Sequence, residues 1–502
     1  MKACFLLQRR FAFIGNKIAK ILKEKHGVDK FCGYVYQRSS YEFLKKQKDV
    51  EYTSLILDEE IHKQYKDEEI DLDYLKNLEK EYGIPNLWPY IAIDRVLMYS
   101  QLIREYPYNT PLYNHDDMMR ILQVKAKAII SFLEKEKPNF IFITVIGGMA
   151  SMLLYHIAKK KNIPILIGIQ TRINDGYTLT EDYKTFSYVE KKFNDLQKNP
   201  SQNEKLSEAK KFIESFQNNP STYSYSLQDT KTYFKRFSRS QHLSLFRIFR
   251  SIIWFLKMTI QYIVKNKKTD HDEEQPMSFL LDRIKRKTRM IVGFTDLYDK
   301  PKKDEAYAYF PLHYEPEISL MLYAPFWMNQ INLIRQIAKS LPVHYKLYVK
   351  EHPPMYGYRT RAYYKKIKKI PNVKLLPPET NTFEIIKNAK LITVITGTAG
   401  WEGLLLKKPT ITFGDVFYNK LSFVKKCENI EKLPFLIKEQ LEEFKYNEQE
   451  LEQFISSILM ESKEIRLQEI WELGEILNDN KKSDTIKHLE ILADLIYKKV
   501  IK

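Results

Sequence analysis

Residues 140–169 read FIFITVIGGMASMLLYHIAKKKNIPILIGI, and this stretch decides the class of fold. The apolar run Phe140–Ile146 predicts a buried strand that ends at Gly147–Gly148, and Ala150–Lys159 predicts the helix that follows. Ile163–Ile169 predicts a second buried strand. Strand, glycine turn, helix and strand at this spacing are typical of a βαβ unit in a parallel sheet.

The residues before this unit continue the pattern, so residues 1–190 form the first predicted domain. Cys4–Leu7 predicts a strand, and Gly15 predicts a turn between that strand and a helix. Residues 114–136 carry apolar side chains at helical spacing, with Lys125 as the one polar residue on the apolar stripe. Helices therefore alternate with strands throughout this half.

The second half of the chain repeats the alternation over residues 291–440. The predicted strands are Tyr307–Pro311, His344–Val349, Val373–Leu375, Leu391–Ile395 and Thr410–Phe413, and the predicted helices include Trp327–Ser340 and Thr382–Ala389. Two such halves predict an α/β protein with two facing Rossmann-like domains. Its site is expected in the cleft between them, at the carboxyl ends of both sheets.

Residues 191–290 separate the two predicted domains, and residues 441–502 form a predicted helical tail. Within the first of these segments, residues 231–268 contain ten basic residues and no acidic one, interleaved with aromatic and aliphatic residues. This composition predicts a basic amphipathic helix or helix pair. Such an insertion could contact an anionic membrane surface or a lipid-linked acceptor. Alternatively, it packs its aromatic residues on the second domain.

Composition and charge restrict the function classes. The 502 residues include 81 Lys and Arg against 63 Asp and Glu, a formal charge of +18 that suits nucleic acid, an anionic membrane or phosphorylated substrates. Lysine is abundant throughout the chain, so part of this charge is compositional bias. No RNA- or DNA-binding module is recognisable, and we expect no nucleic-acid partner.

The sequence also favours a cytoplasmic protein. Cys4, Cys32 and Cys427 are far apart, lack metal-ligand spacing and fit a reducing compartment. No apolar stretch approaches the ~18 residues of a membrane span. The apolar run at the N-terminus is broken after five residues by Gln8–Arg10, which argues against a signal peptide.

Three loops at predicted strand ends carry the strongest chemical signal. The third loop, residues 396–403, places Gly397 and Gly400 where a helix begins, so that its free N–H groups and positive dipole end face an anion. Thr396 and Thr398 add hydroxyl donors, and Glu402 is positioned to accept two hydroxyl groups of a ribose. Alternatively, the threonines only cap the helix and the glycines only turn the chain.

The other two loops are residues 310–317 and 350–353. In the latter, His352 follows Lys350 at a strand end, and both side chains are candidates to contact a phosphate. In the former, His313 and Glu317 are candidates for a base or for a group that stabilises an oxocarbenium-like centre. A charged surface loop is the alternative for this pair.

These three loops together resemble a known family. The segments FPLHYEPE (310–317), VKEHPPM (349–355) and TVITGTAGWEGLLLKKPTITFGDVFY (393–418) are similar to capsular polysaccharide biosynthesis proteins, a group that includes Kdo transferases. The resemblance covers about residues 300–420. It implies a GT-B fold, to which this chain adds a helical insertion and a helical tail. It also implies a nucleotide-sugar donor such as CMP-Kdo.

The resemblance also implies roles for particular residues. The implied donor-binding residues are His352, Thr396, Thr398 and Glu402, and the implied catalytic residues at the sugar end are His313 and Glu317. The loops themselves add Lys350, Gly397 and Gly400 to the predicted donor site. No DxD-like metal motif stands near this site, so we expect no metal and no cofactor besides the donor substrate. The leaving-group charge is expected to meet Lys350, His352 and the helix end.

The first domain is expected to bind the acceptor through its own strand-end loops. Arg9 and Arg10 follow the first strand, and Gln170 and Arg172 follow a later one, where an arginine can grip an acidic or phosphorylated acceptor. Asp175 is the candidate base. Each of these is also explained as an ordinary polar loop residue.

Taken together, these features predict a cytoplasmic, metal-independent glycosyltransferase, peripheral on the inner face of the plasma membrane, that elongates a capsular or other surface polysaccharide or glycolipid. Three alternatives remain. A sugar-nucleotide 2-epimerase or a CDP-polyol phosphotransferase of the teichoic-acid type shares the architecture, and a polysaccharide-assembly protein keeps the fold without a working donor site.

Overall fold

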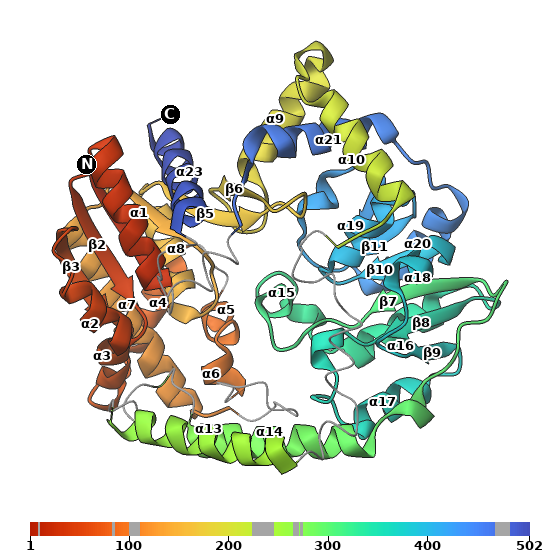
Figure 1. Ribbon diagram of the computed structural model, residues 1–502, viewed down its shortest axis with the longest axis horizontal. Coiled ribbons are helices and arrows are strands. Elements are labelled where there is room, and N and C mark those ends of the chain that lie inside the picture. The colour runs from red at the N-terminus through yellow and green to blue at the C-terminus, as the bar shows by residue number, and fades with distance from the viewer. Residues whose placement is uncertain are drawn as a thin grey trace.

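The computed structural model describes residues 1–8, 11–82, 86–99, 111–222, 245–264, 271, 275–466 and 482–501. Figure 1 shows two α/β lobes side by side, each built around one sheet. Long helices run along one side of both lobes, and a second group of helices lies on the opposite side. We call the lobes N-terminal and C-terminal after the sheets they contain.

The sheet of the N-terminal lobe has seven strands in the order β13-β6-β5-β4-β1-β2-β3. Its strands are β1 (Lys2–Leu7), β2 (Lys30–Val35), β3 (Tyr52–Leu57), β4 (Phe140–Ile143), β5 (Ile165–Gln170), β6 (Gly176–Thr180) and β13 (Lys463–Glu464). β1 to β5 are parallel, whereas β6 and β13 run antiparallel to their neighbours. The chain order reverses between β1 and β4, which is the switch point of a doubly wound sheet.

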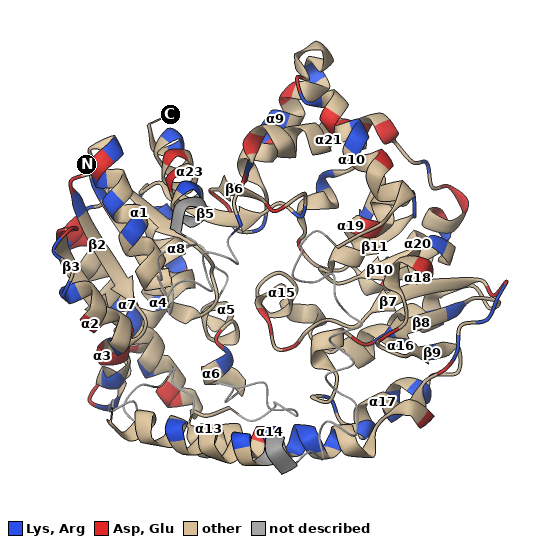
Figure 2. Cartoon of the chain, viewed as in Figure 1, with Lys and Arg blue, Asp and Glu red and all other residues tan. Residues whose placement is uncertain are grey.

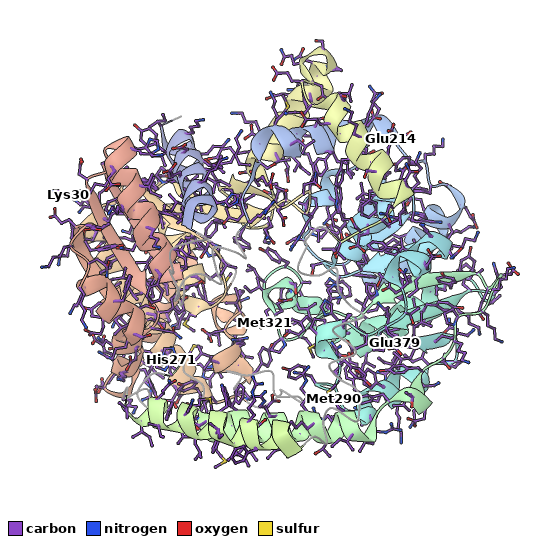
Figure 3. All side chains as sticks on the ribbon, viewed as in Figure 1. Lys30, Glu214, His271, Met290, Met321 and Glu379 are labelled. Carbon is purple, nitrogen blue, oxygen red and sulfur yellow. The ribbon has the colours of Figure 1, made fainter. Side chains whose placement is uncertain are left out.

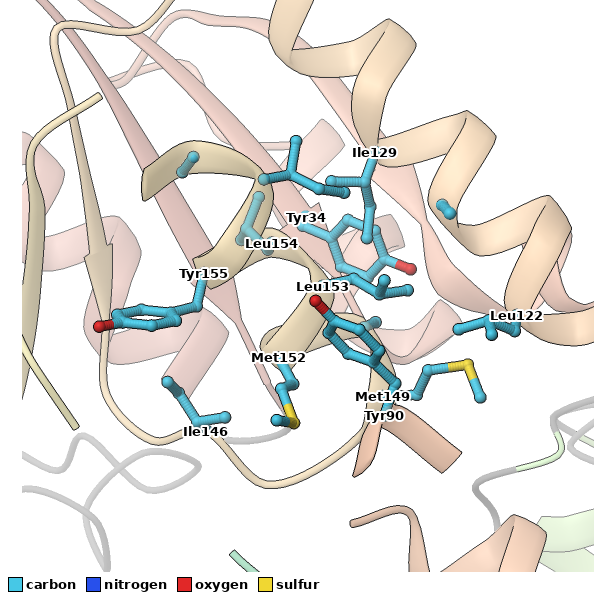
Figure 4. Packing of buried hydrophobic residues seen from close by; sticks show 14 of the residues in the cluster. Tyr34, Tyr90, Leu122, Ile129, Ile146, Met149, Met152, Leu153, Leu154 and Tyr155 are labelled. Carbon is cyan, nitrogen blue, oxygen red and sulfur yellow. The ribbon is translucent and has the colours of Figure 1, made fainter. Parts of the chain in front are cut away.

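Helices cover both faces of this sheet. α7 (His115–Glu136) and α8 (Met149–Lys160) pack on one face, where Tyr34, Ile129 and Leu153 belong to one buried cluster (Figure 4). α1 (Phe11–His26) and α23 (Lys482–Val500) belong to the cluster on the other face. A sheet buried on both faces explains why its strands read as continuous apolar runs rather than as alternating ones.

Gly15 corrects one prediction for this lobe, because it lies inside α1 and not in a turn. A Cβ atom at Gly15 would lie 2.6 Å from Cδ2 of Leu7. The glycine therefore lets α1 approach β1 closely, and this packing outweighs the cost of about 1 kcal/mol for glycine within a helix.

The C-terminal lobe contains a six-stranded parallel sheet in the order β12-β11-β10-β7-β8-β9. Its strands are β7 (Tyr307–Pro311), β8 (Lys346–Lys350), β9 (Val373–Leu376), β10 (Leu391–Val394), β11 (Thr410–Thr412) and β12 (Val424–Lys426). The covering helices include α16 (Gln330–Ser340), α17 (Arg361–Lys368), α18 (Thr382–Asn388), α19 (Thr398–Leu405) and α20 (Leu433–Glu442). The order reverses between β7 and β10, so this lobe is Rossmann-like as well.

Three helices connect the lobes on the upper side of Figure 1: α9 (Ser187–Lys198), α10 (Leu206–Asn218) and α21 (Glu448–Glu461). Phe193, Phe216 and Phe454 from these helices share a buried cluster with Trp401 of α19. After α21, the chain adds β13 to the N-terminal sheet and then packs α23 on α1. The predicted tail thus contributes to both lobes, and the predicted domain boundaries stay a prediction.

Candidate functional site

A cavity of about 290 Å³ lies between the two lobes. One wall is the loop after β5, with Arg172 and Asp175, and the other is the first turns of α19, with Thr398 and Glu402. The remaining lining residues are Asn174, Phe212, Phe216, Ser221, Thr222, Trp401, Leu405 and Glu464. The cavity is therefore at the carboxyl ends of strands from both sheets, where the topology predicts a site.

The loop after β5 has an unusual backbone. Arg172, Asn174 and Asp175 have φ angles of 64°, 44° and 52°, in the left-handed region that non-glycine residues rarely adopt. The loop is closed by the Thr171 N–H, which donates to the Gly176 carbonyl at 2.9 Å, and the Asp175 carbonyl accepts from the Ile465 N–H at 3.2 Å. Left-handed residues of this kind persist where the surroundings fix them, and they often mark functional sites.

α19 begins where the chain leaves β10. Gly397 is its N-cap residue, and no side chain caps the helix. The first N–H groups of a helix have no partner within the helix, and they form the positive end of its dipole. This end of α19 therefore offers an anion site at the cavity wall.

The residues beneath this turn hold it in place rather than line the cavity. His313 Nε2 accepts from the Thr396 N–H at 3.1 Å, and the Thr396 hydroxyl donates to the Ser319 carbonyl at 2.8 Å. The Tyr418 hydroxyl donates to the Gly397 carbonyl at 2.8 Å. A Cβ atom at Gly397 would lie 3.2 Å from His313 Nε2, so the glycine allows this close packing.

Glu402, which lines the cavity, interacts electrostatically with Lys350 behind it. Both side chains are buried. Burial raises the pKa of Glu402 to about 7, against the hydrogen bond from Thr398 and the charge of Lys350. Burial also lowers the pKa of Lys350 to about 8, and its ammonium group donates to the Thr382 hydroxyl at 2.6 Å. Both groups thus change charge close to neutral pH.

Arg359 is a fully buried residue that the sequence did not single out. Its guanidinium group binds Glu315 at 2.9 Å, also binds Glu351, and donates to the His313 carbonyl at 2.6 Å. It joins the loop 310–317 to the loop 350–353. Two buried carboxylates need a buried cation, but the sequence does not indicate which cation meets them.

The structure places the three predicted catalytic residues differently. Asp175 lines the cavity. His313 is buried, and burial together with the charges of His352 and Arg359 lowers its pKa to about 3. Glu317 accepts from the Ser319 hydroxyl at 3.1 Å at the start of α15 (Ile318–Met321) and does not line the cavity. Only Asp175 of these three is brought to the cavity.

The predicted donor and acceptor residues divide in the same way. Thr398, Glu402 and Arg172 line the cavity, whereas Lys350, His352, Thr396, Gly397, Gly400 and Gln170 do not. The His352 ring lies 5.6 Å from the Tyr314 ring, and the backbone N–H of His352 donates to the Glu351 carboxylate at 2.6 Å. Gln170 lies beside Arg172, and the distance from its Oε1 atom to the Arg172 guanidinium is 3.5 Å. The predicted residues Arg9 and Arg10 lie outside the described residues.

Sequence reasoning missed the aromatic part of the cavity wall. Trp401 lies within the third loop, but Phe212 and Phe216 come from α10, far away in sequence. Nothing in the helical pattern of residues 191–217 indicates which lobe this helix meets. This part of the wall can be identified only from the path that the chain takes between the two lobes.

Comparison with known families supports the resemblance seen in the sequence. Residues 300–425 match the model of a family described as capsule polysaccharide biosynthesis protein. The matched segment contains the three loops 310–317, 350–353 and 396–403. The predicted resemblance to this family is therefore confirmed for the C-terminal lobe. No curated protein matches the chain.

Several solved structures are similar at low identity. The beta Kdo 2,7 transferase of Thermosulfurimonas dismutans KpsC is 12% identical, covers 66% of this chain and 80% of its own, and has a TM-score of 0.35. The UDP-GlcNAc 2-epimerase of Methanocaldococcus jannaschii is 13% identical over 92% of this chain and 99% of its own, with a TM-score of 0.25. A glycosyltransferase of Rickettsia africae is 11% identical over 100% and 98%, with a TM-score of 0.26.

The strand order and the cavity define the class of the protein. Two Rossmann-like lobes face each other across a site at their strand ends. This is the GT-B fold, as predicted. The part of the chain with the three loops matches the model of the capsule polysaccharide biosynthesis family.

Proposed function

We propose that the chain is a glycosyltransferase that moves a sugar from a nucleotide-sugar donor to a bacterial capsular or other surface polysaccharide or glycolipid. CMP-Kdo is the candidate donor. The observation that carries this proposal is the cavity in which the N-terminus of α19 and Glu402 face the loop of Arg172 and Asp175. The C-terminal lobe contributes an anion site to this cavity, and the N-terminal lobe contributes an arginine and a carboxylate.

The donor half of the site is proposed on the α19 side. The helix N-terminus binds the donor phosphate, and the Glu402 carboxylate accepts from ribose hydroxyl groups. Burial raises the pKa of Glu402 to about 7, and the charge of Lys350 opposes this shift and so favours the ionised carboxylate. His313 is proposed as a positioning residue, since its imidazole contacts the Thr396 amide. Catalytic contact by Glu317 stays a prediction.

The acceptor half is proposed on the β5 side. Arg172 binds an acidic or phosphorylated acceptor, and Asp175 takes the proton of the attacking hydroxyl group. The hydroxyl oxygen forms a bond to the anomeric carbon, and the bond from that carbon to the donor phosphate oxygen breaks. The electron pair leaves with the nucleotide, whose charge is stabilised by the α19 N-terminus. No metal is assigned a role in this proposal.

A cytoplasmic location is part of the proposal. Cys4, Cys32 and Cys427 are free and buried, which suits a reducing compartment. No helix in the part of the chain that the structure describes is long and apolar enough to cross a membrane.

A thermal-shift screen of the purified protein against CMP, CDP, UDP, GDP and dTDP tests the donor half. We expect one nucleotide to stabilise the wild type and not Glu402→Gln. The matched control is Glu384→Gln on neighbouring α18, an exposed glutamate that should keep the shift. Selective stabilisation by CMP supports Kdo-type transfer, and by CDP the polyol-phosphate alternative. Equal shifts in wild type and Glu402→Gln, or none with any nucleotide, contradict the proposed donor site.

A further inference from the structure

α13 (Leu245–Val264) and α14 (Pro276–Val292) run along the lower side of both lobes in Figure 1. We call this pair the strap. The two helices contact each other through Trp254 and Phe279, whose rings are 4.8 Å apart, and Arg283 lies 5.0 Å from the Trp254 ring. The strap is on the opposite side of the molecule from α9, α10 and α21.

The strap is anchored to both lobes. His271, between the two helices, stacks on His62 with ring centroids 3.7 Å apart, and its Nε2 lies 3.4 Å from Asp58 of the N-terminal lobe. At the other end, Arg286 donates to the Tyr358 hydroxyl at 3.0 Å in the C-terminal lobe, and Met290 is buried there. The labelled His271 and Met290 lie at these two ends in Figure 3. Because both ends of the strap are attached to the lobes, its outer, solvent-facing side has a fixed orientation relative to them.

That outer face is apolar. In α13, Phe249, Ile252, Leu256, Ile260 and Ile263 are exposed and follow the spacing of one helical stripe. Phe249 is 63% exposed and Ile260 is 59% exposed. In α14, Met277, Leu281 and Ile284 are exposed as well. Phe249, an aromatic residue of the insertion, is therefore not packed on the second domain.

The charged residues around this apolar stripe are basic. Arg250 and Lys257 of α13, and Arg283 and Lys285 of α14, are exposed. The one acidic residue of these helices is Asp282, which is buried. In Figure 2 the ribbon of the strap carries the blue of Lys and Arg at several places along its length. An apolar stripe flanked by lysine and arginine is the pattern of a helix that lies in the interface of an anionic membrane.

We propose that the strap is a docking surface for an anionic lipid bilayer. Its apolar stripe enters the headgroup and acyl boundary, while Arg250, Lys257, Arg283 and Lys285 meet lipid phosphates. A second copy of this chain fits the same face less well, because two equally basic straps would repel each other. Nucleic acid would leave the apolar stripe exposed to water. The inference concerns a surface remote from the cavity and does not depend on the proposed reaction.

Sedimentation of the full-length protein with vesicles tests this inference. One set of vesicles is phosphatidylcholine alone, and the other contains phosphatidylglycerol in addition. We expect binding to the second set, weakened by salt because the charges at the surface are screened. The charge-reversal variant Arg250→Glu/Lys257→Glu should lose at least about tenfold in partition to these vesicles. Lys198→Glu/Lys211→Glu, two exposed lysines of α9 and α10 on the far side, is the matched control that should bind normally.

A second variant pair tests the apolar stripe. Ile252→Gln/Leu256→Gln/Ile260→Gln should also lose binding, whereas Phe326→Gln/Val343→Gln/Phe435→Gln, which removes three exposed apolar side chains elsewhere, should keep it. All six positions are exposed, so circular dichroism should show that both variants fold. Wild type that ignores anionic vesicles overturns the inference, as do strap variants that bind like the controls. Light scattering provides a further outcome. If the wild type does not bind vesicles but forms a dimer that only the strap variant loses, the face belongs to a second copy, and the inference is overturned as well.

Discussion

In the C-terminal lobe the wall of the cavity rests on buried side chains, whereas in the N-terminal lobe it rests on backbone hydrogen bonds. His313, Tyr418 and Arg359 hold the turn that leads into α19 and the loops beside it. The loop after β5 instead keeps three left-handed residues in place through its own turn and the edge strand β13. Under the proposed function, the buried side chains would hold the donor side of the cavity, and the loop after β5 would form the acceptor side.

The largest expected effect comes from Arg359. Arg359→Ala leaves Glu315 and Glu351 buried without their cation, which costs about 3–5 kcal/mol of folding free energy. Chemical denaturation measures this loss. Arg361→Ala is the matched control, because Arg361 pairs with exposed Asp296 and its loss should shift the unfolding midpoint far less. Equal effects of the two substitutions would mean that the C-terminal wall does not depend on the buried network.

The next effect tests how closely the turn and Tyr418 are packed. A Cβ atom at Gly400 would collide with the Tyr418 hydroxyl and would lie 2.8 Å from Cγ2 of Val394. Gly400→Ala should therefore cost about 1–3 kcal/mol.

Thermal unfolding of a double-mutant cycle is the measurement for this packing. Tyr418→Phe removes the hydroxyl group, so the double variant should lose less than the sum of the two single variants. Strict additivity would contradict close packing between these residues.

The pH dependence of nucleotide binding sharpens the same comparison. Glu402 is ionised above about pH 7 and Lys350 is charged below about pH 8, so both carry charge only between these values. Nucleotide affinity should peak there and fall by up to about tenfold per pH unit on the acid side. Isothermal titration across pH 5 to 9 measures this profile. Glu402→Gln should bind the nucleotide too weakly to show the acid limb at any pH, and an acid limb of normal affinity in this variant would assign it to another group.

The stability of the protein responds to the same shift in a definite direction. The raised pKa of Glu402 means that the folded state favours the neutral carboxyl. Its stabilising contribution is present at acid pH and is lost as the pH rises through about 7. Relative to wild type, Glu402→Gln should therefore gain stability on going from pH 5 to pH 8, as measured by thermal unfolding. The opposite trend would mean that the pKa of Glu402 is lowered in the folded state rather than raised.

The smallest effect concerns the N-terminal wall. Arg172 has a φ angle of 64°, so Arg172→Gly should be more stable than Arg172→Ala by about 0.5–1 kcal/mol. Both variants lose the guanidinium group, and the proposed function predicts that both lose transfer to an acidic acceptor. Denaturation curves and transfer assays on the two proteins separate backbone strain from side-chain chemistry. Equal stability would mean that the loop relaxes when the side chain is removed.

The sequence predicted the parts of the fold that periodicity and apolar runs determine. β1, β4 and α7 were predicted because their buried faces show directly in the pattern of apolar residues. β3 and β6 were missed: β3 reads as an exposed and half-buried edge strand, and β6 follows a tight left-handed turn. Both lack a continuous apolar run of the kind that identified the central strands.

Spatial pairing was the part that the sequence could not supply. Lys125 stood out as a polar residue on the α7 stripe, but only the structure shows that it is buried against Asp58 at 2.8 Å. Arg359 is a similar case. The sequence also indicated an anion site at α19 and an arginine with a carboxylate after β5. It did not indicate that Thr396, Gly397 and Gly400 would support the turn instead of lining the cavity.

Hydrogen–deuterium exchange with and without the stabilising nucleotide tests most directly whether the cavity between the lobes is the donor site. The proposed site predicts slower exchange at the amides of residues 397–402, with a smaller change in residues 171–176 across the cavity. The strap should exchange equally in both states. Protection confined to other parts of the protein, or no change at 397–402, would contradict the assignment of the α19 N-terminus as the anion site.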